Sequence, residues 1–311
     1  MNTTHFLRTG TALAAGAALW ATTQNAGAQF YITSDPTFGY NTAAVIGAYN
    51  MDGTVINSSL ASVPGAYPGA LTWAGNDLYA AYNLSSGSWQ IGEFATGGGT
   101  VNASLFTFNS VEGLVYSGGN LFANLFGNVG VYNPATGTTN NSDLVLLRGA
   151  SDGIAVSGGN IYDAGIEADQ IYVYNDTTGA TVGAGVSIPG NYYLKAIAID
   201  GNDLFVLSTD EYDIDGHIGE YNLTTGAAIN TSLVSNLESP GSTIAVDYGD
   251  ILVTTDNGSR VSEYNETNGA LINADLVSGV DITSIAIPEP TTLALAGLGG
   301  LSLLLARRRQ P

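Results

Sequence analysis

Two short motifs recur along the chain, and their period constrains the fold more than any other feature. The first is an aromatic residue followed by a turn, usually through asparagine, and its copies lie at Tyr49, Phe94, Tyr132, Tyr174, Tyr221 and Tyr264. The second is Gly-Asn or Gly-Asp before an apolar run, and its copies begin at Gly75, Gly119, Gly159, Gly201 and Gly249. Successive copies lie roughly 43 residues apart, which is the length of one propeller blade.

Each repeat is predicted to form four short strands, a to d. Apolar runs such as Ile244-Ala245-Val246 supply strand a, and the Gly-Asn dipeptide turns the chain into strand b. Strand c ends at the aromatic residue. A glycine four residues after the asparagine fits a left-handed turn into strand d, and it occurs at Gly137, Gly179, Gly226 and Gly269. No stretch of 29–287 has helical periodicity.

The two ends of the repeat array predict that it closes into a ring. Residues 29–33 resemble strand b and 45–50 resemble strand c, but no strand a precedes them. Residues 283–287 resemble strand a with no strand b after them. We therefore expect an all-β, six-bladed propeller of four-stranded blades, in which the last strand completes the first blade and hides its edge. A seven-bladed ring and an open β-solenoid are the alternatives.

Composition excludes several classes of function. The formal net charge is -20, so binding to a nucleic-acid backbone is excluded. The chain has no cysteine, which rules out a disulfide scaffold, a thiolate metal site and a cysteine nucleophile. The hydrophobic share of 45% is enough to build a large core.

Residues 1–28 are predicted to be a signal peptide. Arg8 supplies the positive charge, 11–20 form a short apolar run, and Ala26-Gly27-Ala28 fits a cleavage site. An N-terminal membrane anchor is the alternative, which the shortness of the apolar run disfavours.

Residues 288–311 have three parts in a fixed order. Pro288, Glu289 and Pro290 come first, an apolar run over 291–306 follows, and Arg307, Arg308 and Arg309 close the chain. The run predicts a single apolar helix with its arginines on the cytoplasmic side. An ordinary tail anchor is the alternative reading of this segment.

This tail resembles the PEP-CTERM sorting signal of Gram-negative, exopolysaccharide-making bacteria. The resemblance implies processing near Pro-Glu-Pro by an exosortase-type enzyme, a membrane cysteine transpeptidase. It also implies an exported protein of the cell envelope, cell surface or extracellular matrix, which the helix anchors to the membrane transiently or stably.

The inner strands resemble those of NHL and SMP-30 type six-bladed propellers. Ser151-Asp152-Gly153-Ile154-Ala155-Val156 and Ile244-Ala245-Val246-Asp247 carry the resemblance. Propellers of these types include lactonases, scaffolds and binders of peptides or glycans, so the fold does not select a function.

Loops on one face of the ring are the candidate ligand surface. In a propeller the d–a and b–c connections surround one mouth of the central channel, and here the predicted d–a loops include 64–68. Arg148, Lys195 and Arg260 are the only basic residues of 29–287, and all three map to this face. Tyr192 and Tyr193 are candidates for stacking on sugars. Alternatively, the basic residues only neutralise nearby acids.

Two acidic residues enter neighbouring inner strands. Glu112 precedes Gly113, and Asp152 precedes Gly153. Resemblance to the SMP-30 type lactonases implies that such acids ligate a metal. Those enzymes also use ligands from further inner strands, and the equivalent positions here hold poor ligands: Pro68, Leu194, Ser242 and Ile282. This departure argues against lactonase chemistry.

A dense acidic stretch is the candidate calcium loop. Glu211, Asp213 and Asp215 alternate before Gly216, as at the start of such a loop, but its twelfth position is Asn222 rather than glutamate. Calcium is thus the one candidate cofactor, and a solvated loop is the alternative.

His217 is the only histidine of 29–287, which disfavours a His-based catalytic site. Asn-x-Ser/Thr triplets such as Asn102-Ala103-Ser104 are expected by chance.

The leading hypothesis is a non-enzymatic, exported propeller that presents a binding face to extracellular polysaccharide or to a surface protein. A metal-dependent, gluconolactonase-like hydrolase that uses Glu112 and Asp152 is the second hypothesis. A purely structural matrix protein is the third.

Overall fold

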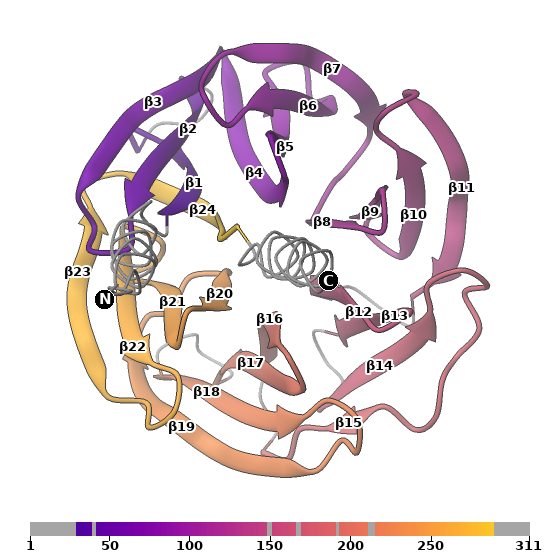
Figure 1. Ribbon diagram of the computed structural model, residues 1–311, viewed down its shortest axis with the longest axis vertical. Helices are drawn as coiled ribbons and strands as arrows, with labels where there is room; N and C mark the ends of the chain where they lie inside the picture. Colours follow the sequence, from indigo (N-terminus) through magenta and orange to yellow (C-terminus); the bar gives the residue numbers. More distant parts are fainter. Residues whose placement is uncertain are drawn as a thin grey trace, which may run out of the picture.

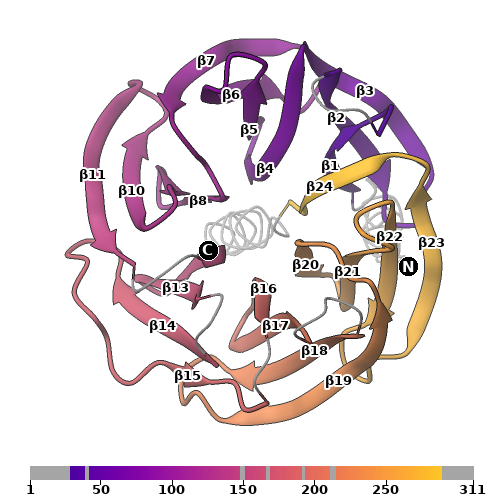
Figure 2. The same cartoon turned by 180° about the vertical axis from the view of Figure 1, so that it is seen from behind.

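The computed structural model describes residues 29–38, 42–147, 151–165, 169–190, 193–210 and 215–288. These residues form six four-stranded antiparallel sheets, arranged like blades around a central channel (Figures 1 and 2). The predicted all-β, six-bladed propeller is therefore confirmed.

In blades 2 to 6 the strands run in chain order from the channel to the rim, whereas blade 1 has the last strand, β24, at the channel. Blade 1 contains β24 (Asp281–Ala286), β1 (Gln29–Asp35), β2 (Ala43–Asn50) and β3 (Val55–Pro64). Blade 2 contains β4 (Ala66–Ala74), β5 (Asp77–Leu84), β6 (Trp89–Ala95) and β7 (Thr100–Phe108). Blade 3 contains β8 (Gly113–Ser117), β9 (Asn120–Asn124), β10 (Asn128–Asn133) and β11 (Thr138–Leu146). Blade 4 contains β12 (Ser151–Ser157), β13 (Asn160–Gly165), β14 (Gln170–Asn175) and β15 (Val186–Ser187). Blade 5 contains β16 (Tyr193–Asp200), β17 (Asp203–Thr209), β18 (Asp215–Asn222) and β19 (Ala228–Glu238). Blade 6 contains β20 (Ile244–Asp247), β21 (Asp250–Thr255), β22 (Arg260–Asn265) and β23 (Leu271–Ser278).

The ring closes where the sequence predicts it. Strand β24 pairs with β1 in antiparallel register, with Tyr31 opposite Ala286 and Ile32 opposite Ile285. The last strand therefore occupies the inner position of the first blade. This arrangement excludes the seven-bladed ring and the solenoid.

In four of the six blades, the repeated aromatic residue of strand c lies over a glycine two positions before it. A Cβ atom placed at Gly130 would lie 2.5 Å from the hydroxyl oxygen of Tyr132, and one at Gly219 would lie 2.8 Å from Cε2 of Tyr221. Blades 1 and 2 repeat this contact between Gly47 and Tyr49 and between Gly92 and Phe94. The motif is thus Gly-x-aromatic in these four blades, whereas blades 4 and 6 have Tyr172 and Ser262 at the glycine position.

The asparagine after the aromatic residue organises the turn into strand d. In blade 5 the Asn222 carbonyl accepts a hydrogen bond from Gly226 N at 2.8 Å, and Asn222 Oδ1 accepts one from Thr225 N at 2.9 Å. Gly226 has φ +68°. The predicted left-handed conformation is confirmed at all four positions: Gly137, Gly179, Gly226 and Gly269.

A second asparagine bends the outer strands. Asn230 Oδ1 accepts a hydrogen bond from Ser232 N at 3.1 Å, next to a shift of register between β18 and β19. The same contact recurs at Asn57, Asn102, Asn141 and Asn273. The asparagine of the triplet at Asn102 is therefore part of the blade repeat, in which the residue two positions later is serine or aspartate.

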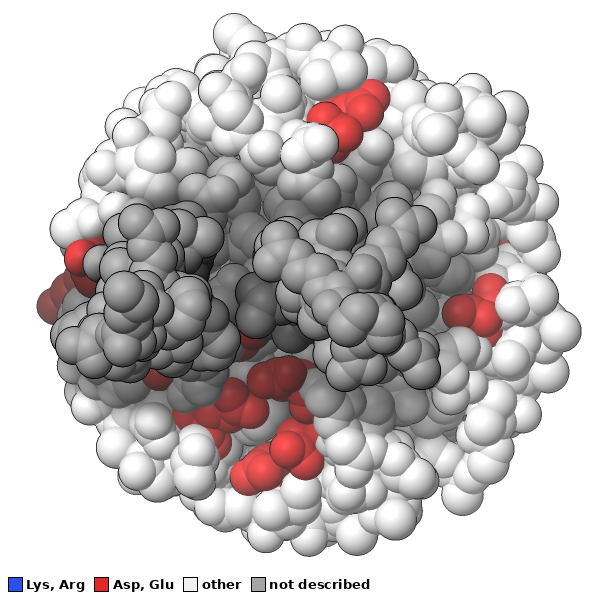
Figure 3. Space-filling view, in the orientation of Figure 1, with Lys and Arg blue, Asp and Glu red and all other residues white. Residues whose placement is uncertain are grey.

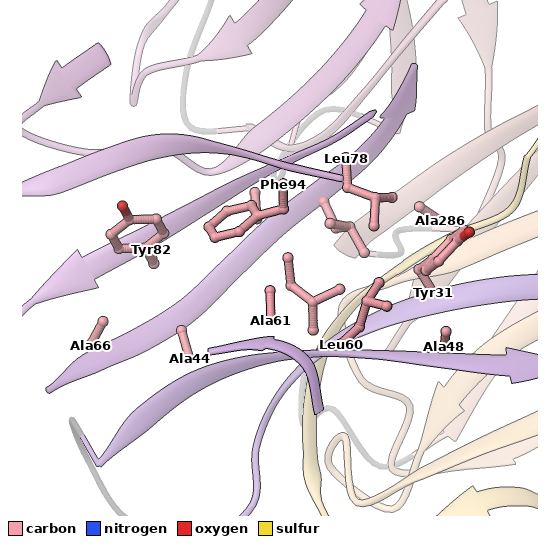
Figure 4. Close-up of a cluster of buried hydrophobic side chains, with 13 residues drawn as sticks. Tyr31, Ala44, Ala48, Leu60, Ala61, Ala66, Leu78, Tyr82, Phe94 and Ala286 are labelled. Atoms are coloured by element: carbon pink, nitrogen blue, oxygen red, sulfur yellow. The ribbon is translucent and has the colours of Figure 1, made fainter. Parts of the chain in front are cut away.

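The hydrophobic core is divided among the junctions between blades. Each of six buried clusters joins two neighbouring blades, and Figure 4 shows the cluster between blades 1 and 2, which includes Tyr31, Leu78 and Phe94. Burial of one such side chain contributes about 1.5–3 kcal/mol. Blade packing therefore supplies most of the stability.

One predicted loop is mostly strand. Strand β3 continues to Pro64 and β4 begins at Ala66, so only Gly65, with φ +70°, separates them.

The predictions for 1–28 and for the helix after Pro288 lie outside the described residues. Within the described part of the chain, no helix is long and apolar enough to cross a membrane.

Candidate functional site

The six inner strands line a cavity of about 660 Å³ along the ring axis. Its walls are formed by β4, β8, β12, β16, β20 and β24. Among the described residues that line it, Glu112 is the only one with a charged side chain. The rest of the lining is apolar or carries neutral hydroxyl groups. The channel therefore favours neutral ligands over ionic ones.

Aromatic side chains gather on the blade 2 side of this cavity. Tyr67 and Trp89 lie near one mouth, Trp73 and Tyr116 lie toward the other, and all four are partly exposed. The Trp89 ring lies over Gly69, where an added Cβ would be 2.6 Å from the ring. Partly exposed aromatic faces offer apolar surface with little loss of conformational entropy on binding.

The two faces of the ring differ. The a–b and c–d hairpins form one face, here called the hairpin face, which Figure 1 views. The d–a and b–c connections form the opposite face, here called the loop face, which Figure 2 views. Tyr67 and Trp89 lie near the loop-face ends of β4 and β6.

Both described ends of the chain lie on the hairpin face. Tyr31 pairs with Ala286, so the chain enters blade 1 at Gln29 and leaves it at Pro288 at the same end of the sheet. The Tyr248 hydroxyl, in the a–b hairpin of blade 6, lies 3.5 Å from the Pro288 carbonyl oxygen. Pro288, the last described residue, therefore lies on the face opposite Tyr67 and Trp89.

The strand ends that carry the predicted pair Glu112 and Asp152 lie next to each other at the junction of blades 3 and 4. Glu112 N donates a hydrogen bond to the Asn124 carbonyl at 2.9 Å, and Asn124 Nδ2 donates one to the Ser151 carbonyl at 2.7 Å. Glu112 itself is exposed on the loop face and accepts a hydrogen bond from Ser110. Asp152 belongs to β12, but its side chain lies outside the described part of the structure.

A buried carboxyl group that the sequence did not predict lies at the same junction. Asp163 in β13 is 1% exposed, and its carboxyl group shares a hydrogen bond with the Ser151 side chain. Burial raises the pKa of Asp163 to about 6, and the Ser151 bond opposes part of this rise. Among the described residues, neither its Oδ1 atom nor the Oδ1 atom of Asn124 has a hydrogen-bond partner.

Acidic side chains cluster on the hairpin face. Burial and the nearby carboxylates of Asp200, Asp203, Glu220 and Asp247 raise the pKa of Glu266 to about 7. Figure 3 shows acidic side chains gathered in the lower part of this face, over the blades that contain β16 to β22, and no described basic side chain on it. Repulsion among these carboxylates is thus concentrated beside the inner hairpins of blades 5 and 6.

The predicted calcium loop is only partly visible. Asp215 begins β18, is exposed, and accepts a hydrogen bond from Asp210 N at 3.2 Å through its carbonyl. Glu211 and Asp213 lie outside the described residues. Over the described ranges, no group of three or more acidic or histidine side chains has an arrangement that would hold a metal ion.

The predicted ligand-face residues have different surroundings. Arg260 pairs with Asp256 at 2.8 Å and with Asp275 at 3.3 Å, so it neutralises neighbouring acids. Lys195 and Tyr193 are half-buried in β16. Arg148 and Tyr192 lie outside the described residues.

Sequence reasoning missed Tyr67 and Trp89, because the repeat pattern does not indicate which strand residues border the channel.

Comparisons with known proteins support the sorting tail and the fold. Residues 286–309 match the family described as PEP-CTERM protein-sorting motif. Glu289, Pro290, Arg307, Arg308 and Arg309 fall inside this match but outside the described structure. No curated protein is similar enough to the chain to count as a relative.

Solved structures share the fold at low sequence identity. A chain from the nidogen/laminin complex is 12% identical and has a TM-score of 0.62, over 83% of this chain and 98% of its own. The WD40 propeller domain of Doa1 is 14% identical and has a TM-score of 0.53, over 78% of this chain and 86% of its own. These similarities establish the propeller fold without singling out the NHL or SMP-30 type.

The motif is a substrate signal for exosortase processing, and its presence marks an exported protein that is anchored or processed at the membrane. The chain is therefore a six-bladed β-propeller that carries a PEP-CTERM protein-sorting motif at its C-terminus.

Proposed function

We propose that this chain is a non-enzymatic binding propeller of the cell envelope or exopolysaccharide matrix of a Gram-negative bacterium. Its binding surface is the loop face, at the channel mouth beside Tyr67 and Trp89. The ligand is an extracellular glycan or a surface protein, and the aromatic lining favours a neutral glycan.

The aromatic residues at the mouth are the observation that carries this proposal. Trp73 and Trp89 are the only tryptophans of 29–287, and both line the channel. Tyr67 OH donates to Asp281 Oδ2 at 3.4 Å, which helps to hold the ring beside the mouth. Rings fixed in this way lose little entropy when a sugar stacks on them.

The direction of the tail supports the same surface. A membrane anchor after Pro288 would hold the hairpin face toward the membrane. The loop face would then point away from the cell, toward matrix glycans or neighbouring surface proteins.

Charge restricts the glycan class. Residues 29–287 carry every acidic residue of the chain except Glu289, against only three basic residues. Such a surface repels polyanions at moderate salt, so an uncharged polysaccharide fits better than an acidic one.

The chemistry of the channel favours binding over catalysis. A lactonase-like hydrolase remains the second candidate because Glu112 and the Ser151-Asp152 segment meet at one junction. Its remaining ligand positions hold Pro68, Leu194, Ser242 and Ile282, which supply no carboxylate. We therefore expect no hydrolysis in a lactone screen with calcium, manganese or zinc. Turnover that Glu112→Gln abolishes would establish the hydrolase instead.

A glycan array with the purified full chain tests the binding proposal. We expect binding to neutral glycans, weakened about tenfold or more by Trp89→Ala or Tyr67→Ala. Tyr248→Ala is the matched control, because Tyr248 is exposed on the hairpin face, and it should bind like the wild type. Absence of glycan binding by the folded wild type, or equal losses in all three variants, would contradict the proposal.

A further inference from the structure

We propose that the loop face has a second glycan subsite, in a groove between blades 2 and 3, which binds a neutral glycan chain that extends outward from the channel mouth. This inference rests on the proposed function, because it assigns a further part of the same face to the same ligand. The groove has a volume of about 570 Å³. Its walls include the end of β7, the d–a connection that follows, and the b–c hairpin of blade 3 (Figure 2).

Phe126 is a lining residue of this groove that the fold does not explain. In the b–c hairpin of blade 3, Leu125 N donates to the Asn128 carbonyl at 2.8 Å, and Phe126 and Gly127 have φ values of +46° and +110°. Positive φ at both central positions of a turn favours Asn-Gly and strains a bulky side chain. Phe126 is also 70% exposed, so its burial does not offset this strain. A strained and exposed aromatic residue on a short hairpin indicates a role in binding.

The groove continues the aromatic surface of the channel mouth. Trp89 in β6 and Phe108 in β7 are direct cross-strand partners, so their side chains lie on the same side of blade 2. Trp89 lines the channel cavity, and the half-buried Phe108 lines the groove. The Phe108 ring is held by an edge contact with buried Tyr132, at 5.0 Å between ring centroids. Aromatic surface therefore leads from the channel mouth through Phe108 to Phe126.

The polar lining of the groove favours a glycan over a protein. Two amide side chains, Asn109 and Asn128, and three hydroxyl side chains line it, against three apolar residues. Asn128 Nδ2 donates to the Ser142 carbonyl at 2.7 Å and to Asp143 Oδ1 at 3.0 Å, which fixes Asn128 Oδ1 as an acceptor. Such amides can bind sugar hydroxyls while the aromatic rings stack on sugar faces. A protein interface would instead have a mostly apolar centre.

Charge around the groove favours a neutral glycan. None of the described residues that line the groove has a charged side chain. Two carboxylates flank it, because Ser110 in the lining donates to Glu112 and Asn128 donates to Asp143. These carboxylates would repel an acidic sugar.

A chain-length series tests the subsite. The probes are neutral gluco-, manno- and galacto-oligosaccharides, from the disaccharide to the hexasaccharide, and calorimetry measures their binding to the purified full chain. The affinity of the wild type should rise with chain length. Phe126→Asn should bind the hexasaccharide about tenfold more weakly and the disaccharide like the wild type, because only the longer chain reaches the groove. Trp89→Ala should weaken the binding of both.

Thermal unfolding without glycan separates binding from folding. Phe126→Asn gives the turn its preferred Asn-Gly sequence, so the melting temperature should equal or exceed that of the wild type. Tyr248→Asn is the matched control, because Tyr248 and Gly249 have φ values of +59° and +87° in a hairpin on the opposite face. This control should bind every probe like the wild type.

The outcomes distinguish this subsite from the proposed function. Absence of binding by the folded wild type would overturn both. If Trp89→Ala weakens binding but Phe126→Asn binds every chain length like the wild type, the subsite alone is overturned, and a protein becomes the better occupant of the groove. Equal losses for the disaccharide and the hexasaccharide, or an equal loss in Tyr248→Asn, would also overturn the subsite. A lower melting temperature of Phe126→Asn would overturn it as well, because Phe126 would then support the fold.

Discussion

The side-chain hydroxyl of Thr33 lies 3.0 Å from that of Thr283, although 250 positions separate the two residues in the sequence. Thr33 Oγ1 also donates to the Gly69 carbonyl at 2.7 Å. The closing pair of strands in blade 1 is thus connected to the inner strand of blade 2. Ring closure is therefore secured by side chains as well as by the β1–β24 ladder.

Removal of the Thr33 hydroxyl should weaken this closure. Thr33→Val keeps the shape of the side chain but leaves the Gly69 carbonyl without this donor in a site where Thr33 is 1% exposed. Because the Thr283 hydroxyl also lies 3.3 Å from the Gly69 carbonyl, we expect a loss of about 0.5–1.5 kcal/mol in the free energy of unfolding. Urea denaturation measures it, with Thr139→Val on the exposed rim as the control. Equal effects of the two substitutions would show that closure does not depend on this hydroxyl.

The Gly-x-aromatic contact makes a second prediction. Gly219→Ala would bring a methyl group to 2.8 Å from the Tyr221 ring, in a layer where Tyr221 is buried. Overpacking of this kind costs about 1–3 kcal/mol. Gly97→Ala is the control, because nothing lies within 4 Å of its added Cβ, and it should leave the midpoint of urea unfolding unchanged. A Gly219→Ala variant as stable as the wild type would contradict the packing role of the motif.

These contacts explain why the fold was predictable from the sequence. The position of Gly-Asn and aromatic-Asn motifs fixes the order of strands within a blade, and the incomplete units at the two ends fix the closure. Each of these motifs lies within a single repeat, so one blade can be predicted from its own sequence, and the ring contains six such blades. The bend at Asn102 and at the equivalent asparagines was missed, because a side-chain hydrogen bond within a strand does not alter the spacing of apolar residues in the sequence.

The candidate sites were harder to predict, because they join residues from different blades. Asp163 and Asn124 stand at different positions of their b strands, and both reach Ser151 only because one side of β9 faces the opposite side of β13. A register alignment of the six b strands would have singled out Asp163 as the one polar residue at its position. Nothing comparable marks Tyr67 and Trp89, because they stand at the loop-face ends of β4 and β6, outside the repeated motifs.

The sorting tail makes a prediction about location. Deletion of 288–311 removes the matched motif but no described strand, so the propeller should still fold and be exported. Cell fractionation should find this variant free in the medium or periplasm, with no membrane-associated precursor. Glu289→Ala should instead accumulate an uncut precursor, visible as a larger band, while Glu238→Ala in β19 should be processed normally. Identical processing of the two single variants would contradict a role for Glu289.

The acidic cluster around Glu266 predicts a pH dependence. The folded pKa of Glu266 is about 7, against an ordinary value of 4.5, so the folded state holds this proton more tightly than the unfolded state does. Protonated Glu266 therefore stabilises the folded state fully below about pH 4.5. This contribution to the free energy of unfolding declines as the pH rises and is lost above about pH 7. Glu266→Gln should raise the free energy of unfolding at pH 8 by about 1 kcal/mol, after allowance for solvent screening, and change it little at pH 4.5. Thermal melts at the two pH values measure this difference.

Added salt should shrink the effect of Glu266→Gln at pH 8, because the repulsion from Asp200, Asp203 and Glu220 is screened. Glu238→Gln, on an exposed part of β19 at the loop face, is the control and should not alter the pH dependence. Equal gains at pH 4.5 and pH 8 would mean that the substitution acts through packing and not through the charge of Glu266.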